Sequence, residues 1–223
     1  MWSAVIAGSR SLVPGKQVRA ATLARAQPRS ALCATLARVR PVPLQTTPPP
    51  RYSRVAIALH WLLAAALAGS FAVGLFMADL ATSPLKLKLY NWHKWAGITI
   101  LALSALRLAW RLTHRPPPDV AMPRWQQRGA HLTHHLLYAL FFAVPLVGWA
   151  YSSAAGFPVV LFGVLPLPDF VAADKALAEA IKPWHGNLAF ALAGLVLLHA
   201  AAALKHHCLD RDGLLGRMWP QRR

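Results

Sequence analysis

Two histidines in the last hydrophobic segment, His185 and His199, lie fourteen residues apart. On an α-helix this spacing is close to four turns, or about 21 Å of rise, so both side chains leave one face at two depths. Each has a histidine at a matching depth on another segment, His93 for His185 and His60 for His199. Imidazole is a standard axial ligand of haem iron, and two imidazoles per iron favour electron transfer. The four histidines therefore predict two bis-histidine haems.

The segments that must position these histidines are four long apolar stretches. Hydrophobic residues make up 56% of the chain, and roughly 20 apolar residues span the hydrocarbon core of a bilayer. Such stretches run from about Val55 to Ala78, Trp95 to Leu112, Thr133 to Ser152 and Trp184 to Ala203. Helices satisfy their own backbone in lipid, and the alternation of a membrane barrel is missing here. We expect an all-α membrane protein, a four-transmembrane-helix bundle with two haems stacked across the bilayer.

The positive charge has an uneven distribution along the chain. Lys and Arg number 24 against 7 Asp and Glu, for a net charge of +17. Nineteen of the 24 lie before the first span, from Arg107 through the second loop, or from Lys205 onward, which puts them on one side, here called inner. The positive-inside rule then predicts a multi-pass membrane protein with both termini in the cytoplasm or its equivalent. Because topology explains the charge and no recognition motif is present, nucleic-acid binding is disfavoured.

Residues 1–50 form a different kind of sequence, rich in Arg, Ser and Ala, free of acids and ending in three prolines. This composition is typical of a disordered basic extension, of a start site assigned too far upstream, or of a transit peptide. We expect residues 51–223 to form the membrane domain and to carry the function. No C-x-x-C-H motif occurs, so any haem in this chain is held without thioether links.

Arg107 lies fourteen residues after His93, on the same face but at the inner depth. No carboxylate lies in any of the four spans, so a haem propionate would be its partner in a bidentate pair. Snorkelling to lipid phosphates is the alternative. Gly97, one turn after His93, and Gly186, next to His185, would let a flat macrocycle approach the backbone. Ordinary packing of small residues between membrane helices explains both glycines equally well.

The other six histidines are weaker candidates. His131, His134 and His135 lie at the inner start of the third span, where they could ligate iron, line a pocket for a quinone head, or belong to a basic interfacial belt. His114, His206 and His207 receive no role. On the outer side, the spacing of apolar residues from Phe170 to Lys182 predicts a short amphipathic helix that lies on the membrane surface or caps the outer haem.

Four stretches of the chain resemble the bacterial cytochrome b561 family. They are RYSRVAIALHW, NWHKWAG with Arg107 following, AHLTHHLLYALFFAVPLVGW and KPWHGNLAFALAGLVLLHAAAALKHH, and the likeness covers about Arg51 to Arg223 in order and with matching spacing. The resemblance implies a four-helix bundle in the bacterial inner membrane with two b haems, ligated at His60, His93, His185 and His199. The basic tail before Arg51 departs from the family's usual short start.

Within that family the likeness is closest to the superoxide oxidase branch, which implies that superoxide outside gives its electron through the haems to ubiquinone. Two outer lysines, Lys94 and Lys182, flank His93 and His185. A cationic funnel there would attract a small anion and raise its encounter rate. Lysines near an anionic headgroup layer are also ordinary, and acids in the same loop partly cancel them. Lys86 and Lys88 lie on the same outer side as Lys94 and Lys182.

Other functions stay open at this point. A quinol-linked or partner-protein electron route would use the same haems. A haem-bearing membrane subunit of a hydrogenase or dehydrogenase would co-purify with a large soluble partner. The ascorbate-linked cytochromes of eukaryotic vesicles use more spans, and a purely structural bundle would show no Soret absorption. No residue pattern indicates an oligomeric state.

Overall fold

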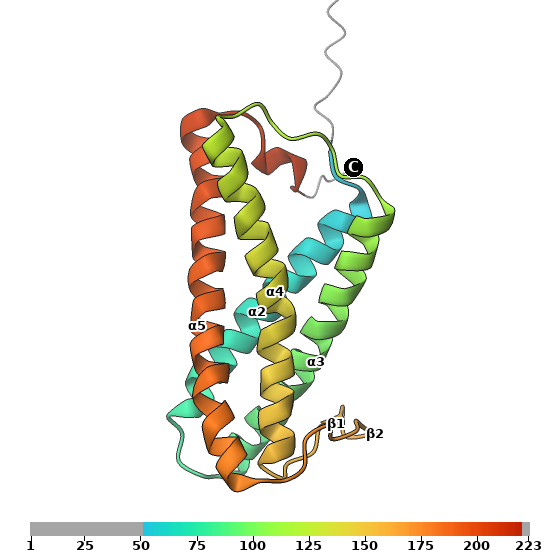
Figure 1. The fold of residues 1–223 in the computed structure, drawn as a ribbon, viewed down its shortest axis with the longest axis vertical. Coiled ribbons are helices and arrows are strands. Elements are labelled where there is room, and N and C mark those ends of the chain that lie inside the picture. Colours follow the sequence, from blue (N-terminus) through green and yellow to red (C-terminus); the bar gives the residue numbers. More distant parts are fainter. Residues whose placement is uncertain (1–50, 220–223) are drawn as a thin grey trace, which may run out of the picture. The chain divides into compact units, whose positions relative to one another are not determined.

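The computed structural model describes residues 51–219, so the predicted extension over residues 1–50 lies outside the described part. Four α-helices run up and down the bundle, α2 (Arg54–Ala78), α3 (Pro84–Thr113), α4 (Arg124–Ala154) and α5 (Lys175–Lys205) (Figure 1). Each is long and apolar enough to cross a membrane. The predicted four-helix all-α membrane bundle is confirmed.

Polar caps set where these helices begin. The side chain of Ser53 accepts from the backbone N–H of Ala56 at the start of α2, and Ser83 does the same for Lys86 in α3. Such caps satisfy backbone N–H groups that have no partner in the first turn. Because Ser83 is followed by Pro84, whose φ suits the first helical position, α3 begins well before the predicted start of its apolar stretch.

The short amphipathic helix predicted from Phe170 to Lys182 is wrong as a separate element. Asp174 caps α5 by accepting from two backbone N–H groups, so the helix starts at Lys175. It then continues through Pro183 into the membrane-spanning part. A proline removes one backbone donor, and a long membrane helix tolerates that loss.

The outer loop between α4 and α5 contains an antiparallel hairpin that the sequence patterns did not predict. Its strands are β1 (Val160–Leu161) and β2 (Leu165–Pro166). The indole Nε1 of Trp95 on α3 donates to the carbonyl of Val160 at 2.7 Å. This bond ties the hairpin to the outer end of the bundle, where Figure 1 shows it beside the ends of α3 and α4.

The inner end is closed by the C-terminal segment. After α5 the chain forms one π-helical turn, η1 (His206–Asp210), and one 3-10 turn, η2 (Leu215–Arg217). Arg51, just before α2, donates to the carbonyl oxygens of Gly216 and Trp219 at 2.9 and 2.6 Å. These bonds hold the start of the first helix against the end of the chain.

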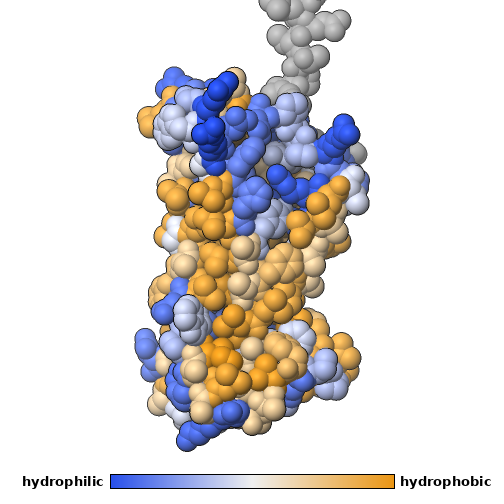
Figure 2. All heavy atoms as spheres, in the orientation of Figure 1, coloured by the Kyte–Doolittle hydropathy of each residue, from blue (hydrophilic) through white to orange (hydrophobic). Residues whose placement is uncertain are grey.

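The apolar core forms one layer halfway along the bundle, to which all four helices contribute: Leu63, Ile100, Leu137, Phe141 and Leu192. Many other large apolar side chains face outward, and Figure 2 shows them as a hydrophobic band between two hydrophilic ends. Examples are Leu62, Phe76, Phe190 and Leu197, at 58%, 60%, 60% and 71% exposed. In water such a surface would aggregate, whereas lipid solvates it.

Candidate functional site

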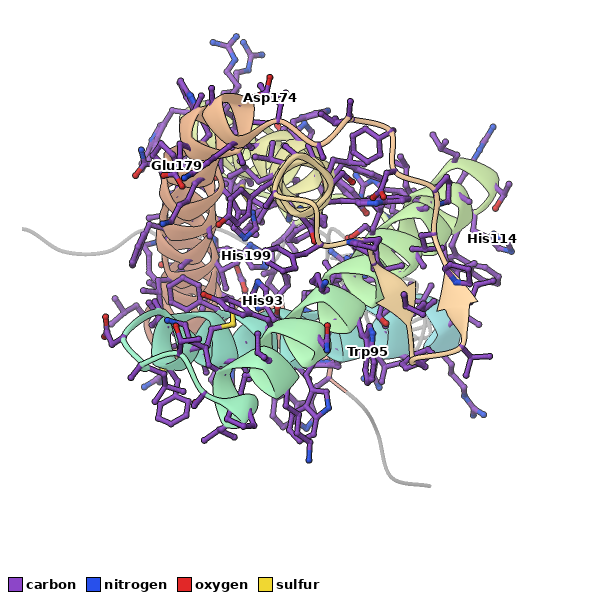
Figure 3. The ribbon with its side chains drawn as sticks, turned by 90° about the horizontal axis from the view of Figure 1, so that it is seen from below. His93, Trp95, His114, Asp174, Glu179 and His199 are labelled. Atoms are coloured by element: carbon purple, nitrogen blue, oxygen red, sulfur yellow. The ribbon has the colours of Figure 1, made fainter. Side chains whose placement is uncertain are left out.

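The outer level of the site consists of His93 on α3 and His185 on α5. Their ring centres lie 6.0 Å apart, with ring planes at 85°. Seen along the bundle in Figure 3, His93 and the inner His199 lie within the ring of helices, whereas His114 lies outside it. The structure therefore brings together the outer residues that depth matching had paired.

Each outer histidine is held by a backbone carbonyl of the adjacent helix. His93 Nδ1 lies 3.0 Å from the carbonyl oxygen of Ser70 on α2, and His185 Nδ1 lies 3.1 Å from that of Val144 on α4. A carbonyl oxygen only accepts, so Nδ1 carries the hydrogen and Nε2 keeps the lone pair in the neutral ring. Metal-binding histidines usually donate their other ring N–H in this way.

Glycines make room for both rings. A Cβ placed on Gly148 of α4 would come within 2.7 Å of His185 Cε1, and one on Gly74 of α2 within 3.2 Å of His93 Cε1. Each glycine lies four residues after the carbonyl that holds the same ring. The carbonyl and the glycine together form a notch in the helix surface, and sequence reasoning did not identify either glycine.

The inner level holds three imidazoles. The ring centres of His60 on α2 and His199 on α5 are 6.3 Å apart, and His134 on α4 lies 5.5 Å from His199. The predicted pair is thus brought together, with a third ring beside it. The structure also separates His134 from its sequence neighbours His131 and His135, whose side chains are exposed.

Arg107 reaches the inner level, as its spacing from His93 predicted, but its partner is a backbone group. Its Nη1 donates to the carbonyl oxygen of Ala56 on α2 at 3.1 Å. Its guanidinium charge lies near the rings of His60 and His199. The bond to Ala56 uses one of the five N–H donors of a guanidinium group, so the side chain can also serve an anionic partner.

All four helices carry two site residues fourteen positions apart. Every helix therefore contributes one residue to the inner level and one to the outer level, and the α2–α3 hairpin repeats the arrangement of the α4–α5 hairpin. The pairs on α2 and α4 are the signal that could have identified Gly74 and Gly148 and distinguished His134 from His131 and His135. In chain order the pairs are His60 and Gly74, His93 and Arg107, His134 and Gly148, and His185 and His199.

The separations of the paired rings fit one metal ion between each pair. Imidazole nitrogens bind zinc, a first-row metal, at about 2.0 Å, so two imidazoles that held one metal ion between them at that length would have ring centres about 6 Å apart. The observed values of 6.0 and 6.3 Å agree with this. A Cβ on Gly97 or Gly186 would meet no protein atom within 4 Å, so close helix packing does not explain those two glycines.

Within residues 51–219, two buried side-chain atoms have no hydrogen-bond partner, Ser104 Oγ on α3 and Trp149 Nε1 on α4. An unpartnered buried polar atom is costly, but both atoms are enclosed by protein, so neither marks the space that a ligand would fill. The four imidazoles, the distances between the paired rings and the open space beside Gly97 and Gly186 all fit haem.

Lys94 is less available for steering than its sequence position suggested. Its Nζ donates to the carbonyl oxygens of Phe157 and Pro158 in the outer loop, at 3.4 and 3.2 Å. Lys86 likewise donates to backbone carbonyls. Lys182 is exposed, and its side chain makes no hydrogen bond or ion pair with any of the described residues.

The remaining histidines that form polar contacts do so at the inner surface. His131 Nε2 lies 3.1 Å from a carboxylate oxygen of Asp119, and His206 Nδ1 lies 2.6 Å from one of Asp212. His135 Nδ1 donates to a backbone carbonyl of its own helix at 2.7 Å. His114 Nδ1 lies 2.9 Å from Thr113 Oγ1, so four of the five histidines outside the two levels have polar partners elsewhere.

Comparisons with known proteins agree with the resemblance read from the sequence. A model of the prokaryotic cytochrome b561 family matches residues 51–221. Cytochrome b561 homolog 2 of Escherichia coli (strain K12) is 35% identical over 178 residues, which cover 78% of this chain and 93% of the relative. The probable superoxide oxidase CybB of Yersinia pestis is 32% identical over 184 residues, covering 78% and 98%. Cytochrome b561 homolog 1 of Escherichia coli is 33% identical over 186 residues, covering 78% and 99%.

Proposed function

We propose that this chain, which belongs to the prokaryotic cytochrome b561 family, moves electrons through two haems b from superoxide on the outer side of the bacterial inner membrane to ubiquinone. Family membership makes it a bacterial membrane protein of haem b electron transfer. The haem count, donor, acceptor and orientation are our proposal. The observation that carries it is the pair of imidazole levels, with ring centres 6.0 and 6.3 Å apart.

The histidines have distinct tasks in this proposal. His93 and His185 hold the outer haem, and His60 and His199 hold the inner one. Bound haem supplies one-electron transfer. The bonds from Nδ1 to backbone carbonyls keep the outer rings in one tautomer and orientation, which limits the rearrangement that follows a change of iron charge.

The identity of the donor is supported by one relative and by charge. The relative from Yersinia pestis is named a probable superoxide oxidase. Two superoxide ions would release two dioxygen molecules and two electrons, which with two protons convert one ubiquinone into ubiquinol. Lys182, exposed at the outer end of α5, would attract the anion, while Lys94 positions the outer loop through Phe157 and Pro158.

The orientation follows from the distribution of basic residues. The hydrophilic end that holds the chain's C-terminal segment carries the arginines of α2, α3 and α4, including Arg54, Arg111 and Arg128. Figure 2 shows this end, at the top, as the more strongly hydrophilic one. Basic residues accumulate on the cytoplasmic side, so we place the inner haem and both termini there.

The proposal predicts fast reduction of the haems by superoxide that slows as salt is added. Salt should slow the reaction because exposed charges attract an anion only within a screening length, which is about 8 Å at 0.15 M salt. Stopped-flow absorbance of the purified protein measures the bimolecular rate. Replacing Lys94 and Lys182 together with Gln should lower the rate roughly threefold to tenfold and flatten the salt dependence. The haem spectrum should not change.

The matched control is Lys175→Gln, which removes an outer charge from the first turn of α5 and should leave the rate within about twofold of the wild-type value. Measuring Lys94→Gln alone separates its contact with the loop carbonyls from its charge. Haems that superoxide does not reduce would favour the second candidate, a quinol-linked electron carrier or a haem-bearing subunit of a dehydrogenase or hydrogenase. The bonds of Lys94 to the loop are the observation in favour of that candidate.

Arg107 gives a separate prediction about the inner haem. Replacing it with Gln removes a positive charge near His60 and His199, which should lower the midpoint potential of the inner haem because the oxidised iron carries one more charge. A shift on the order of 60 mV corresponds to a factor of ten in the one-electron equilibrium. Redox titration of both haems measures it.

The outer haem and an Arg128→Gln variant, which changes an exposed charge on the same side, serve as controls for Arg107. Unchanged potentials in Arg107→Gln would show that the side chain only binds the carbonyl of Ala56 or snorkels to lipid.

A further inference from the structure

A cavity of about 500 Å³ opens at the inner edge of the bundle. It lies among the start of α2, the end of α3 and the loop that follows α3, and we call it the inner cavity. Four arginines line it, and within residues 51–219 no carboxylate does. A pocket with positive charges and no opposite charge selects an anion. The arginines are Arg51, Arg107, Arg111 and Arg115.

The protein holds two of these arginines in place without neutralising them. Arg51 and Arg107 each donate to backbone carbonyls, so their positions are fixed and their charges persist. Arg111 and Arg115 are exposed, and in the described part of the chain neither forms an ion pair. The inner cavity therefore combines a rigid cationic wall with two cations free to close on a ligand.

The acid nearest to these two arginines in the chain, Asp119, is engaged elsewhere. Its carboxylate accepts from Gln127 Nε2 at 2.9 Å and lies 3.1 Å from His131 Nε2. The hydrogen bond from Gln127 is the largest cause that holds the pKa of Asp119 below its ordinary value, and the charge of Arg111 is the smallest cause. Asp119 thus does not provide the counter-charge of the inner cavity.

The rest of the lining shows what kind of anion fits. Apolar and aromatic side chains complete the walls: Leu59, Trp110, Tyr138 and Met218. Just outside, the lipid-facing surfaces of α2 and α3 carry Val55 and Leu106, which are 42% and 54% exposed. An anion with hydrocarbon chains can fill the cavity with its phosphate and cover these surfaces with its chains.

We propose that the inner cavity binds the phosphate group of an anionic phospholipid. Basic pockets between membrane helices on the cytoplasmic side favour anionic headgroups, and a guanidinium fork matches phosphate oxygens in a bidentate fashion. The inference goes beyond electron transfer and does not depend on the identity of the electron donor. Its test uses lipid binding, which is read out independently of haem reduction.

The experiment is native mass spectrometry of the delipidated, haem-loaded full chain, titrated with phosphatidylglycerol, with phosphatidylcholine of the same acyl chains, and with inorganic phosphate. We expect phosphatidylglycerol to bind about tenfold or more tightly than phosphatidylcholine, and this preference to disappear in an Arg111→Gln, Arg115→Gln double variant. A variant with Lys at both positions should keep part of it. An Arg124→Gln, Arg128→Gln variant, which removes two exposed charges outside the cavity on the same side, should keep all of it.

The outcomes distinguish a specific lipid site from general surface charge and from a site for a soluble anion. Equal losses in the cavity variant and in the Arg124, Arg128 variant would show that general surface charge attracts the lipid, and would overturn the site. Inorganic phosphate that binds as tightly as phosphatidylglycerol would overturn the lipid assignment in favour of a soluble anion. Unchanged Soret absorption in the cavity variant serves as the folding control, and the Lys variant tests the site if the Gln variant does not fold.

Discussion

Replacing His93 or His185 with alanine should lower the haem content from two per chain to one, and replacing His60 or His199 should do the same at the other level. Each substitution removes one of the two axial ligands of one haem, and with it one of the two iron–imidazole bonds that we expect to retain that haem during purification. The pyridine-haemochrome assay gives the haem-to-protein ratio. The residual spectrum should be the same within a pair and different between pairs, because the two levels have different surroundings.

His134 supplies the sharpest test of the inner pair. Its ring centre is nearer to His199 than that of His60 is, at 5.5 Å against 6.3 Å. We expect His134→Ala to keep both haems, with at most a shift in the inner spectrum. If His134→Ala lost the inner haem and His60→Ala kept it, the inner ligands would be His134 and His199, and the pairing by depth would be wrong.

Much of the fold could be predicted because membrane helices depend on local properties. Apolar length places a helix, and a fixed rise per residue places side chains at common depths. These two rules were enough to assign His185 to the outer level and His199 to the inner level. Helix ends were less predictable, since they depend on single caps such as Asp174 and on whether a proline such as Pro183 interrupts the helix.

The packing of the site could not be predicted from depth alone. Depth says that His134 and His60 both lie near the inner side, but only helix rotation decides that His134 faces His199 while His131 faces Asp119. Likewise, the bonds of Lys94 to the outer loop join residues more than 60 positions apart. No local pattern specifies such contacts.

Gly74 and Gly148, the glycines beside the outer rings, were predictable only in part. Which helices pack as neighbours is a tertiary property, so a glycine beside His185 could not be named from α5 alone. The fourteen-residue spacing from His134 to Gly148, equal to that from His60 to Gly74, is nevertheless visible in the sequence. Recognising it requires treating the two helical hairpins as repeats of one arrangement, with a glycine wherever a ring from the next helix must approach the backbone.

Gly148→Ala should weaken binding of the outer haem by about tenfold to 100-fold, the range found when groups that orient metal ligands are changed. The new Cβ would lie 2.7 Å from His185 Cε1, so the ring has to retreat by about 0.7 Å to reach an ordinary contact of 3.4 Å. Site geometry has to be held within about 0.5 Å. Haem content after detergent washing, together with a redox titration, measures the loss and assigns it to the outer level.

The size of the effect should follow the size of the clash. Gly74→Ala, where the Cβ would lie 3.2 Å from His93 Cε1, should weaken the outer haem less than Gly148→Ala does, and Gly194→Ala, which meets nothing within 4 Å, should not weaken it. Alanine favours a helix over glycine by about 1 kcal/mol, so propensity alone would make all three variants more stable. A loss of the outer haem that is equal in all three variants would therefore exclude the notch as its cause. A loss confined to Gly148→Ala and Gly74→Ala, in that order, can arise only if each alanine presses on the ligand ring that its glycine accommodates.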